Sequence, residues 1–599
     1  MSTAAELRLR ARAFSPDPFP AGSVGDSEWA YAPGDFELLL LHRIVRQGFA
    51  ANRSVHYAEN FPAAPEQRMF RRGDEIVRAA AVRGSGWQVR IDDAWRAAEV
   101  RRGGDTAPHE VDEPVVALPV RPLDDGLLDV GVTVLGRPVF RSAEVPVVFS
   151  GESAAEARSD EPGETRHDVR PLGDGWWTTV HRLGFRYLRI AGASSVRVEA
   201  NIRPVPSAGV FLCSDDELNR IWAVAAYTIR LCLQGLVLDG VKRDRMPWIG
   251  DQALNTLSNA YAVGDGGIVR DGLVALGRPD GYVNGIADYS LWWLIGRGLH
   301  RRYFGGSVPD TVLTELLREC GDDGVFRPRG AGFGGIEGSV LIDWGVRIEP
   351  DRDLTALQLL CYWALREAGS PVADVLRRTL YDRAWDASAG AWREYLDDSP
   401  SDDPYPNLLA VLSGIGHGDG AVAAIRNGAV RTPWMAAFAV RALAAAGHPE
   451  EAVERMRARW APLLAAGATT FWEDFTAEGE SPYEMYGRPF GKSLAHAWGA
   501  GPAAILPETV LGIRPESDGW ATFSVAPRLG ALRWASAVVP IPHGDIVVEA
   551  AGGSVTVELP GGTRLLRPEA IGPTRVSWVP AGNDEDPAKN VSFESIPAG

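Results

Sequence analysis

The sequence predicts a multidomain protein in which an all-α domain is flanked by β-sandwich domains at both ends. Its 599 residues exceed the ~100 to 150 residues of a typical domain several times over. Both ends of the chain have short β-like segments, and the middle has recurrent amphipathic helical stretches. We therefore expect three regions, at 1–205, 206–510 and 511–599.

The first region is rich in short segments of β-branched and aromatic residues, separated by Gly, Pro and Asp. The clearest segments are 87–91, 145–149 and 195–199. Between them, residues 151–168 are small and charged and include almost no large apolar side chain. This composition is typical of a long surface loop or linker. The region is thus expected to form one or two β-sandwich modules.

The middle region has the period of amphipathic helices. Asp and Glu in the first turn of the opening stretch favour a helix start there. The expected helices are 215–234, 252–263, 266–276, 288–303, 309–320, 353–368, 372–384, 405–414, 418–427, 432–447, 449–460 and 493–505. Twelve helices joined as six hairpins favour an (α/α)6 barrel. A helical repeat array would give a similar alternation, but we find no fixed repeat motif of the kind that marks such an array.

The last region returns to a β-like pattern after residue 511. Segments 545–549 and 554–559 are apolar and β-branched, and an Ala-Ala-Gly-Gly stretch separates them. This arrangement predicts a hairpin, and with it a C-terminal β-sandwich.

Composition excludes several classes of protein. Hydrophobic residues make up 45% and charged residues 23% of the chain, which is ordinary for a globular protein. Sixty-one Lys and Arg against 78 Asp and Glu leave a net charge of −17. This balance argues against nucleic acid or an anionic membrane as a partner, since both select clustered Lys and Arg. No signal peptide or membrane-spanning segment is recognisable, so we expect a cytoplasmic protein. The oligomeric state is not indicated.

The cysteines predict neither a metal site nor a disulfide framework. The four cysteines lie far apart with no CxxC pair. Buried free thiols are the simpler interpretation.

The densest polar cluster of the helical region is segment 239–251. It contains three carboxylates, a lysine, two arginines and a tryptophan, and its Gly and Pro residues prevent a regular helix. Loops on a rigid scaffold are where active sites accumulate, although a salt-bridge network at the rim would have the same composition. The candidate residues are Asp239, Arg243, Asp244, Trp248 and Asp251.

A second cluster places Glu473 beside Trp472 and Phe475. A partly desolvated carboxylate has a raised pKa and can act as a general base. In isolation, a helix cap or a surface Glu beside core aromatics would be the favoured explanation of this pattern.

Further acids and a histidine lie close to tryptophans in the sequence. Tryptophan faces stack on sugars while carboxylates and histidine bind hydroxyls, so this pairing suits a carbohydrate pocket. Core packing would explain the tryptophans as well. No Walker loop, HExxH or G-x-S-x-G is present, which leaves paired carboxylates as the best available chemistry. The residues concerned are Asp288, Asp343, Trp344 and His496.

Segment 239–251 resembles the signature D-x-x-x-R-(D/E), followed by W-x-G-D, of the α-L-rhamnosidases, glycoside hydrolase family 78. Other segments agree with that family in the same order, namely 185–190 with 209–219, 343–344, 467–473, and 493–502 with 511–515. The resemblance covers roughly residues 180–515 and is specific through the combination and order of its motifs.

The resemblance implies a catalytic (α/α)6 barrel with flanking β-sandwiches and a set of site residues. Asp244 would be the general acid and Glu473 the base that activates water. Since the family's acid is usually Glu, Asp239 and Asp251 remain alternative acids. The implied sugar-site residues are Asp239, Arg243, Trp248 and Asp251, and Asp288, Asp343, Trp344 and His496 would line the same pocket.

The function expected from this resemblance is exo-acting hydrolysis that releases terminal α-L-rhamnose with inversion. Its substrate would be a rhamnosylated glycoside or oligosaccharide. We expect no cofactor and no metal, because two carboxylates fill the acid and base roles. The alternatives are another (α/α)6 glycosidase, a lyase acting on rhamnose next to a uronic acid, and a sugar-binding protein without catalytic activity.

Overall fold

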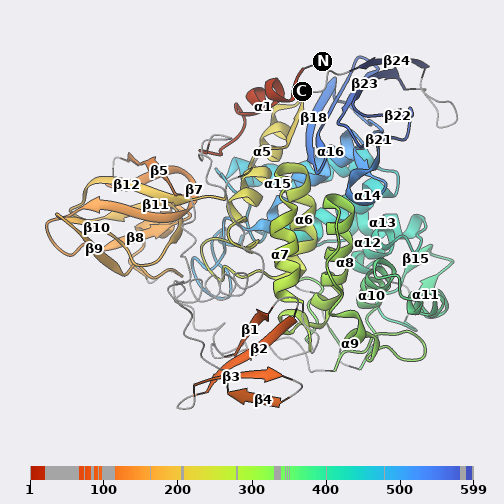
Figure 1. The fold of residues 1–599 in the computed structure, drawn as a ribbon, viewed down its shortest axis with the longest axis horizontal. Coiled ribbons are helices and arrows are strands. Elements are labelled where there is room, and N and C mark those ends of the chain that lie inside the picture. Colours follow the sequence, from red (N-terminus) through yellow and green to blue (C-terminus); the bar gives the residue numbers. More distant parts are fainter. Residues whose placement is uncertain are drawn as a thin grey trace.

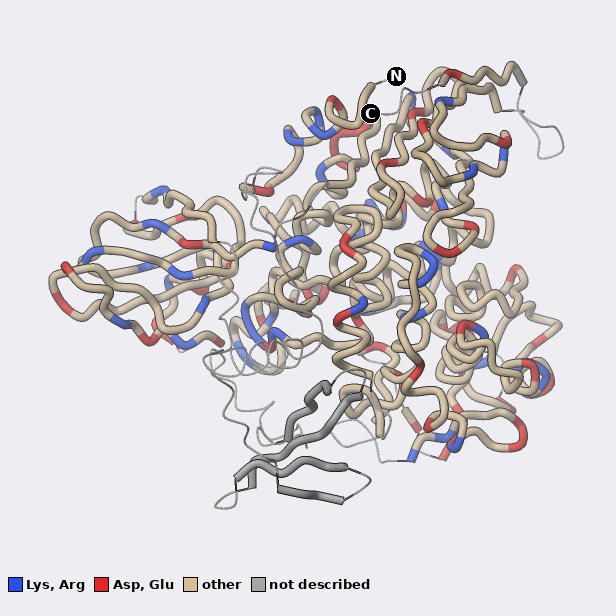
Figure 2. The backbone as a smooth tube through the Cα atoms, viewed as in Figure 1, with Lys and Arg blue, Asp and Glu red and all other residues tan. Residues whose placement is uncertain are grey.

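The computed structural model describes residues 2–19, the backbone of four strands between residues 67 and 97, and most of residues 115–595. The gaps after residue 115 are 124, 162–163, 204, 206–207, 278–280, 330–338, 345, 347, 350, 399–400, 478 and 581–588. Within the described residues, no helix combines the length and apolar character that crossing a bilayer requires. Basic and acidic residues are both spread over the described chain (Figure 2).

The chain begins with a helix, which differs from the β-like start that the sequence predicts. This helix, α1 (Ala4–Ala11), follows a capping box in which Thr3 and Glu6 each bind the other's backbone N–H. Leu7 is fully buried in a small cluster with Val210 and Val538 of the C-terminal sheet. The capping box is a local signal for the start of a helix, and the burial of Leu7 against the C-terminal sheet stabilises this helix further.

The predicted β segments 87–91 and 195–199 lie in two sheets, whereas only the end of segment 145–149 enters a strand. Four antiparallel strands form the first sheet, in the order β1 (Gln67–Arg72), β2 (Glu75–Val82), β3 (Gly86–Ile91) and β4 (Ala94–Ala97). We call residues 115–201 the β-module. Its strands are β5 (Val115–Pro119), β6 (Arg121–Pro122), β7 (Leu128–Arg141), β8 (Val148–Gly151), β9 (Val169–Gly173), β10 (Trp176–Thr179), β11 (Leu183–Ile190) and β12 (Ser194–Asn201).

The β-module forms one eight-stranded sheet around β7. The order is β5-β12-β7-β10-β9, and β11 pairs with β7 and β8. Figure 1 shows the module as a lobe on one side of the helical region, away from the C-terminal sheet.

Segment 151–168 is not the exposed linker that its composition predicts. It includes the short helix α4 (Ala154–Arg158), and the side chains of Glu152, Glu156 and Glu164 are all buried. The prediction was wrong because these carboxylates bind cations that come from distant parts of the chain. Composition does not reveal such long-range partners.

Twelve α-helices fill the described part of residues 216–510. Their bounds agree with most of the predicted ranges. They are α5 (Asp216–Cys232), α6 (Ile249–Ala262), α7 (Gly266–Leu276), α8 (Ala287–Phe304), α9 (Leu313–Leu317), α10 (Thr355–Glu367), α11 (Val372–Arg383), α12 (Pro404–Ser413), α13 (Asp419–Asn427), α14 (Pro433–Ala445), α15 (Pro449–Ala465) and α16 (Pro502–Val510).

The predicted helix at 493–505 was wrong in its first half. Residues 493–496 are not helical, because the Ser493 carbonyl accepts the Glu473 N–H, the Ser493 N–H donates to the Glu473 carboxylate, and the His496 N–H donates to the Phe471 carbonyl. A 3-10 turn, η2 (Ala497–Ala500), follows, and α16 starts only at Pro502. Proline is suited to the first helical position because it lacks an N–H.

Alternate helices pack in a closed series. Helix α6 packs against α8, α8 against α10, α10 against α12, α12 against α14, α14 against α16, and α16 against α6. Aromatic side chains from several of these helices pack against one another. Trp292 of α8 stacks on Phe438 of α14 at a centroid distance of 5.4 Å and meets Trp363 of α10 edge-on at 5.9 Å. Trp292 is fully buried, as expected for a core residue.

The predicted C-terminal hairpin is confirmed. Strands β19 (Gly544–Ala551) and β20 (Ser554–Leu559) pair antiparallel in the six-stranded sheet β13-β18-β19-β20-β23-β24. Its other strands are β13 (Val210–Cys213), β18 (Trp534–Ile541), β23 (Thr574–Val579) and β24 (Lys589–Ser595). A smaller sheet is formed by β16 (Arg514–Pro515), β17 (Thr522–Ser524), β21 (Arg564–Leu565) and β22 (Ala570–Ile571). Two further strands, β14 (Trp385–Asp386) and β15 (Ala391–Trp392), pair beside α13.

Candidate active site

The polar segment 239–251 forms the connection between α5 and α6. Asp239 organises it, since its Oδ1 accepts the backbone N–H of Gly240 at 2.7 Å and that of Met246 at 2.8 Å. Its own carbonyl accepts the N–H of Ala497, which ties the loop to the segment after Glu473. Burial, with repulsion from neighbouring carboxylates, raises the pKa of Asp239 well above its ordinary value.

Arg243 stands between the two predicted catalytic carboxylates. Its Nη1 donates to Asp244 Oδ2 at 2.6 Å, and its Nη2 contacts both carboxylate oxygens of Glu473. Its Nε donates to the Gly491 carbonyl at 2.6 Å, so each guanidinium nitrogen is used. The structure therefore brings Asp244 and Glu473, 229 positions apart in the printed sequence, onto neighbouring nitrogens of one buried arginine.

The surroundings of these two carboxylates move their pKa values in opposite directions. Burial raises the pKa of Asp244 to about 6, against the attraction of Arg243 and with added repulsion from Glu473. Burial acts in the same direction on Glu473, but the Arg243 guanidinium and the Ser493 N–H outweigh it and lower its pKa. At mildly acidic pH one group therefore carries a proton and the other is ionised, which is the division that acid–base chemistry needs.

The backbone at Asp244 is unusual. Asp244 and Arg245 both have φ of 55°, in the left-handed region that residues other than glycine and asparagine seldom enter. Consecutive residues in this conformation indicate a locally strained turn, of the kind that occurs at functional sites. Arg245 is held by donating to the Val241 carbonyl at 2.7 Å.

Three buried polar atoms at this site have no hydrogen-bond partner among the described residues. They are Asp251 Oδ2, in the first turn of α6, His496 Nδ1, and Oδ1 of Asp474, the neighbour of Glu473. Burial raises the pKa of Asp251 well above its ordinary value and lowers that of His496 to about 3, so the imidazole is neutral. Because unpartnered buried polar atoms are costly, they are natural positions for the hydroxyl groups of a ligand.

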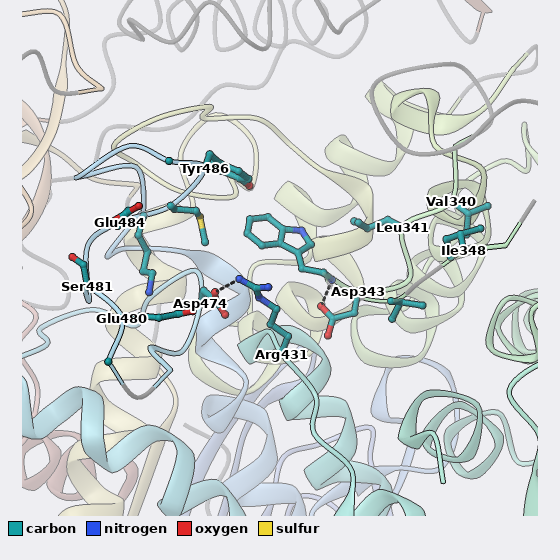
Figure 3. Close-up of a pocket in the computed structure, with 16 residues that line it drawn as sticks. Val340, Leu341, Asp343, Ile348, Arg431, Asp474, Glu480, Ser481, Glu484 and Tyr486 are labelled. Carbon is teal, nitrogen blue, oxygen red and sulfur yellow. Dashed lines mark hydrogen bonds and ion pairs between the residues drawn. The ribbon is translucent and has the colours of Figure 1, made fainter. Parts of the chain in front are cut away.

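A cavity of about 690 Å³ adjoins this cluster (Figure 3). Asp343 and Trp344 form part of its wall. Asp343 accepts the Tyr405 hydroxyl at 2.6 Å and the Thr432 hydroxyl at 2.7 Å, and burial raises its pKa to about 6. The Trp344 ring lies edge-on to Trp498 at 5.8 Å. The other lining residues are Val340, Leu341, Val346, Ile348, Arg431, Asp474, Gly479, Glu480, Ser481, Glu484, Met485, Tyr486, Gly487 and Lys492.

The acid cluster and the cavity meet at Met485 and Tyr486. Arg243 Nη2 lies 3.5 Å from Met485 Sδ, and its guanidinium carbon lies 5.1 Å from the Tyr486 ring centroid. Asp474, the neighbour of Glu473, also lines the cavity and is paired with Arg431 at 3.4 Å (Figure 3). Sequence reasoning missed the lining residues Met485, Tyr486, Arg431 and Asp474. Of these four, only Asp474 lies within a motif that it used.

Asp288 supports the wall, and of the predicted site residues only Asp343 and Trp344 line the cavity itself. Its carboxylate accepts the N–H groups of Leu341 and Ile342 at 2.9 and 3.1 Å. Ile342 has φ of 56°, which is strained for a β-branched residue, so these bonds hold the turn that presents Asp343. Trp248 is half-buried at the start of α6 and lies edge-on to Tyr289 at 6.1 Å.

Within the described part of the chain, no group of three His, Cys, Asp or Glu side chains is arranged to hold a metal ion.

Comparison with known families identifies two segments. Residues 206–288 match the bacterial alpha-L-rhamnosidase 6 hairpin glycosidase domain, and residues 512–565 match the bacterial alpha-L-rhamnosidase C-terminal domain. The resemblance to the α-L-rhamnosidases is confirmed. The first match contains the whole of segment 239–251 and ends at Asp288.

Solved structures of rhamnosidases share this fold. The rhamnosidase of Bacillus sp. GL1 is 23% identical with a TM-score of 0.59, over 77% of this chain and 54% of its own. The rhamnosidase of Klebsiella oxytoca with rhamnose bound is 20% identical with a TM-score of 0.51, over 78% of this chain and 98% of its own. The α-L-rhamnosidase of Streptomyces avermitilis complexed with L-rhamnose is 17% identical with a TM-score of 0.52, over 83% of this chain and 57% of its own.

The chain thus spans little more than half the length of the Bacillus and Streptomyces proteins. No curated protein sequence matches it significantly.

Proposed function

We propose that this chain is an exo-acting glycoside hydrolase that releases terminal α-L-rhamnose with inversion. The observation that carries the proposal is the opposite displacement of two pKa values around Arg243, up for Asp244 and down for Glu473. Hydrolysis of a glycosidic bond needs one protonated and one ionised carboxyl group. The family resemblance and the rhamnose bound to two of the structural neighbours support α-L-rhamnose as the sugar.

In this proposal Asp244 donates a proton to the departing oxygen, and Glu473 takes a proton from the attacking water. The two residues come from different loops, one before α6 and one after α15. Inversion requires room for water, with carboxyl groups roughly 6.5–9.5 Å apart in the substrate complex. Arg243 orients both groups and neutralises the ionised one.

The remaining site residues are assigned to the sugar. Asp251 and His496 offer their unpartnered atoms to hydroxyl groups, while Asp239 holds the loop that carries Asp244. Trp248 and Trp344 offer ring faces, Asp343 a carboxylate, and Asp288 supports the turn before it. The cavity has the size of a small-molecule site, which suits the end of a glycoside better than the middle of a polymer.

The proposal includes the architecture. We assign α6, α8, α10, α12, α14 and α16 to the inner ring of an (α/α)6 barrel, on the basis of their packing in a closed series. The barrel would be the catalytic domain at 206–510, with β-sandwich domains at 1–205 and 511–599. The substrate would be a rhamnosylated glycoside or oligosaccharide. A cytoplasmic location and the lack of nucleic-acid or membrane partners remain predictions.

A panel of 4-nitrophenyl glycosides tests the proposal. The α-L-rhamnoside should release nitrophenolate at least ~100-fold faster than the α-glucoside and other sugars, because the site discriminates through several polar contacts. Glu473→Gln provides the inactive control. Faster release from the α-glucoside would contradict the rhamnose assignment. An unsaturated product from a rhamnose–uronate substrate would identify a lyase, and saturable rhamnoside binding without turnover would identify a binding protein.

A further inference from the structure

Segment 239–251 carries a buried lysine for which the proposed mechanism has no role. Lys242 is 2% exposed, and its Nζ donates to the carbonyls of Phe490 at 2.8 Å and Lys492 at 2.6 Å. The same Nζ lies 3.4 Å from a carboxylate oxygen of Glu152 and 3.4 Å from one of Glu156. A buried ammonium needs an opposite charge nearby. Here the β-module provides both carboxyl groups that lie near the ammonium, and burial raises the pKa of each, that of Glu156 to about 7.

The two carboxylates are fixed within the β-module. The Glu152 N–H donates to Glu156 Oε2 at 3.1 Å, and Ser153 Oγ accepts the Glu156 N–H at 3.1 Å. Arg189 on β11 donates to the Ala157 carbonyl at 3.2 Å and so holds α4 against the sheet. The pair is therefore presented from a rigid support rather than from a free loop.

Segment 490–494 connects this pair to the proposed base. The Leu494 N–H donates to Glu152 Oε2 at 2.5 Å, and the preceding N–H, from Ser493, donates to Glu473 Oε2 at 2.9 Å. Adjacent backbone amides therefore bind a carboxylate of the β-module and the carboxylate proposed to activate water. A displacement at Leu494 would reach Glu473 through a single peptide unit.

The same segment is bound to the arginine that holds Asp244. Between the two carbonyls that accept from Lys242 lies Gly491, whose carbonyl accepts from Arg243 Nε at 2.6 Å. Strand β11 approaches the loop so closely that a Cβ on Gly184 would lie 2.2 Å from the Val241 carbonyl oxygen. The β-module thus packs directly against the backbone that precedes Lys242.

We propose that Glu152 and Glu156 are positioning residues for the acid–base pair. They bind Lys242, and Glu152 also binds the Leu494 N–H; in this way they fix segment 490–494, which orients Glu473 and Arg243. The β-module is then a part of the active-site architecture rather than a separable carbohydrate-binding module. This inference rests on the proposed function for its catalytic consequence, but the contacts themselves can be tested without a substrate.

Hydrogen exchange of the full chain tests the contacts directly. Glu152→Gln removes the charge that Leu494 and Lys242 meet, so the amides of Ser493 and Leu494 should exchange at least ~10-fold faster than in the original protein. Glu161→Gln, an exposed position of the same β-module segment, is the matched control and should leave this exchange unchanged. Unchanged exchange in Glu152→Gln would overturn the proposal. If Glu152→Gln fails to fold, Glu156→Gln provides the same test through Lys242.

A ratio of two rates tests the catalytic consequence. kcat/KM is measured for 4-nitrophenyl α-L-rhamnoside and for an alkyl α-L-rhamnoside, whose leaving group needs the acid. The ratio is the value for the 4-nitrophenyl rhamnoside divided by the value for the alkyl rhamnoside. Because both values scale with the fraction of folded protein, this ratio reports the geometry of the site and not stability. Glu152→Gln should raise this ratio at least ~10-fold, since small displacements of catalytic groups cost large factors. Glu161→Gln should leave it unchanged.

The outcomes separate this inference from the proposed function. Faster exchange with an unchanged ratio would overturn the positioning role. If the original protein cleaves no rhamnoside, the proposed function fails, and faster exchange alone would still support the contact of the β-module carboxylates with segment 490–494.

Discussion

Replacing Asp244 by Asn should separate good from poor leaving groups. Burial raises the pKa of Asp244 to about 6, so half of the protein carries the reactive proton at pH 6. A carboxyl group at its ordinary pKa of 3.8 would be protonated in below ~1% of molecules at that pH. The site thus increases the protonated fraction by nearly ~100-fold. Asn has the same shape but no such proton to give.

The expected losses follow from the basicity of the leaving oxygen. General-acid assistance contributes about 10²–10⁴-fold, and most of it is needed for an alkyl rhamnoside. We expect Asp244→Asn to lose roughly this factor on an alkyl α-L-rhamnoside and about 10-fold on 4-nitrophenyl α-L-rhamnoside. The assay is kcat/KM for both substrates at pH 6. Asp322→Asn, at an exposed position in the α9–α10 connection, is the control.

Equal losses on the two substrates would refute the acid role of Asp244. Full activity on both would move that role to Asp239 or Asp251, whose pKa values are also raised by burial.

Further predictions concern the base, the pH profile, the cavity wall and metal ions. Glu473→Gln should reduce turnover about 10³-fold while calorimetry still detects L-rhamnose binding, because the amide keeps the shape but takes no proton; joint loss of binding would assign Glu473 to the sugar instead. On an alkyl rhamnoside, kcat/KM should fall as pH rises through about 6, where Asp244 loses its proton, and fall again at low pH as Glu473 gains one; a rate that stays constant from pH 5 to 8 would contradict the assignment of Asp244 as the acid. Trp344→Ala should raise KM about 10-fold with little change in kcat, since a stacking face contributes on the order of 1 kcal/mol; an unchanged KM would place Trp344 outside the sugar site. Exhaustive chelation should leave turnover unchanged, because two carboxylates fill the acid and base roles; activity that is lost and then restored by a divalent ion would overturn this.

Local signals predicted most of the helices. The ranges 266–276 and 372–384 nearly coincide with α7 (Gly266–Leu276) and α11 (Val372–Arg383), because an amphipathic period is a property of consecutive residues. The range 493–505 failed in its first half for the opposite reason. Ser493 bonds to Glu473, twenty positions earlier, and such a long-range contact overrides the local pattern.

The candidate site was predictable where its chemistry lies in one motif. Asp239, Arg243 and Asp244 were found through a compact polar segment, and the structure gathers them with Glu473. The supporting groups were not predictable. Glu152 and Glu156 lie in a segment whose small, charged residues favour a surface loop, and their burial depends on a lysine about 90 positions away. Nothing in the local sequence reports that partner.

Proton NMR of the first product tests the central claim most directly. The full chain is mixed with 4-nitrophenyl α-L-rhamnoside, and the anomeric signals are followed during the first minutes, before mutarotation mixes the anomers. Water that Glu473 activates attacks the face opposite the leaving group, so the account predicts β-L-rhamnose as the first-formed sugar. α-L-Rhamnose as the first product, or a covalent sugar ester on Glu473, would show that this carboxylate is a nucleophile and would contradict the account.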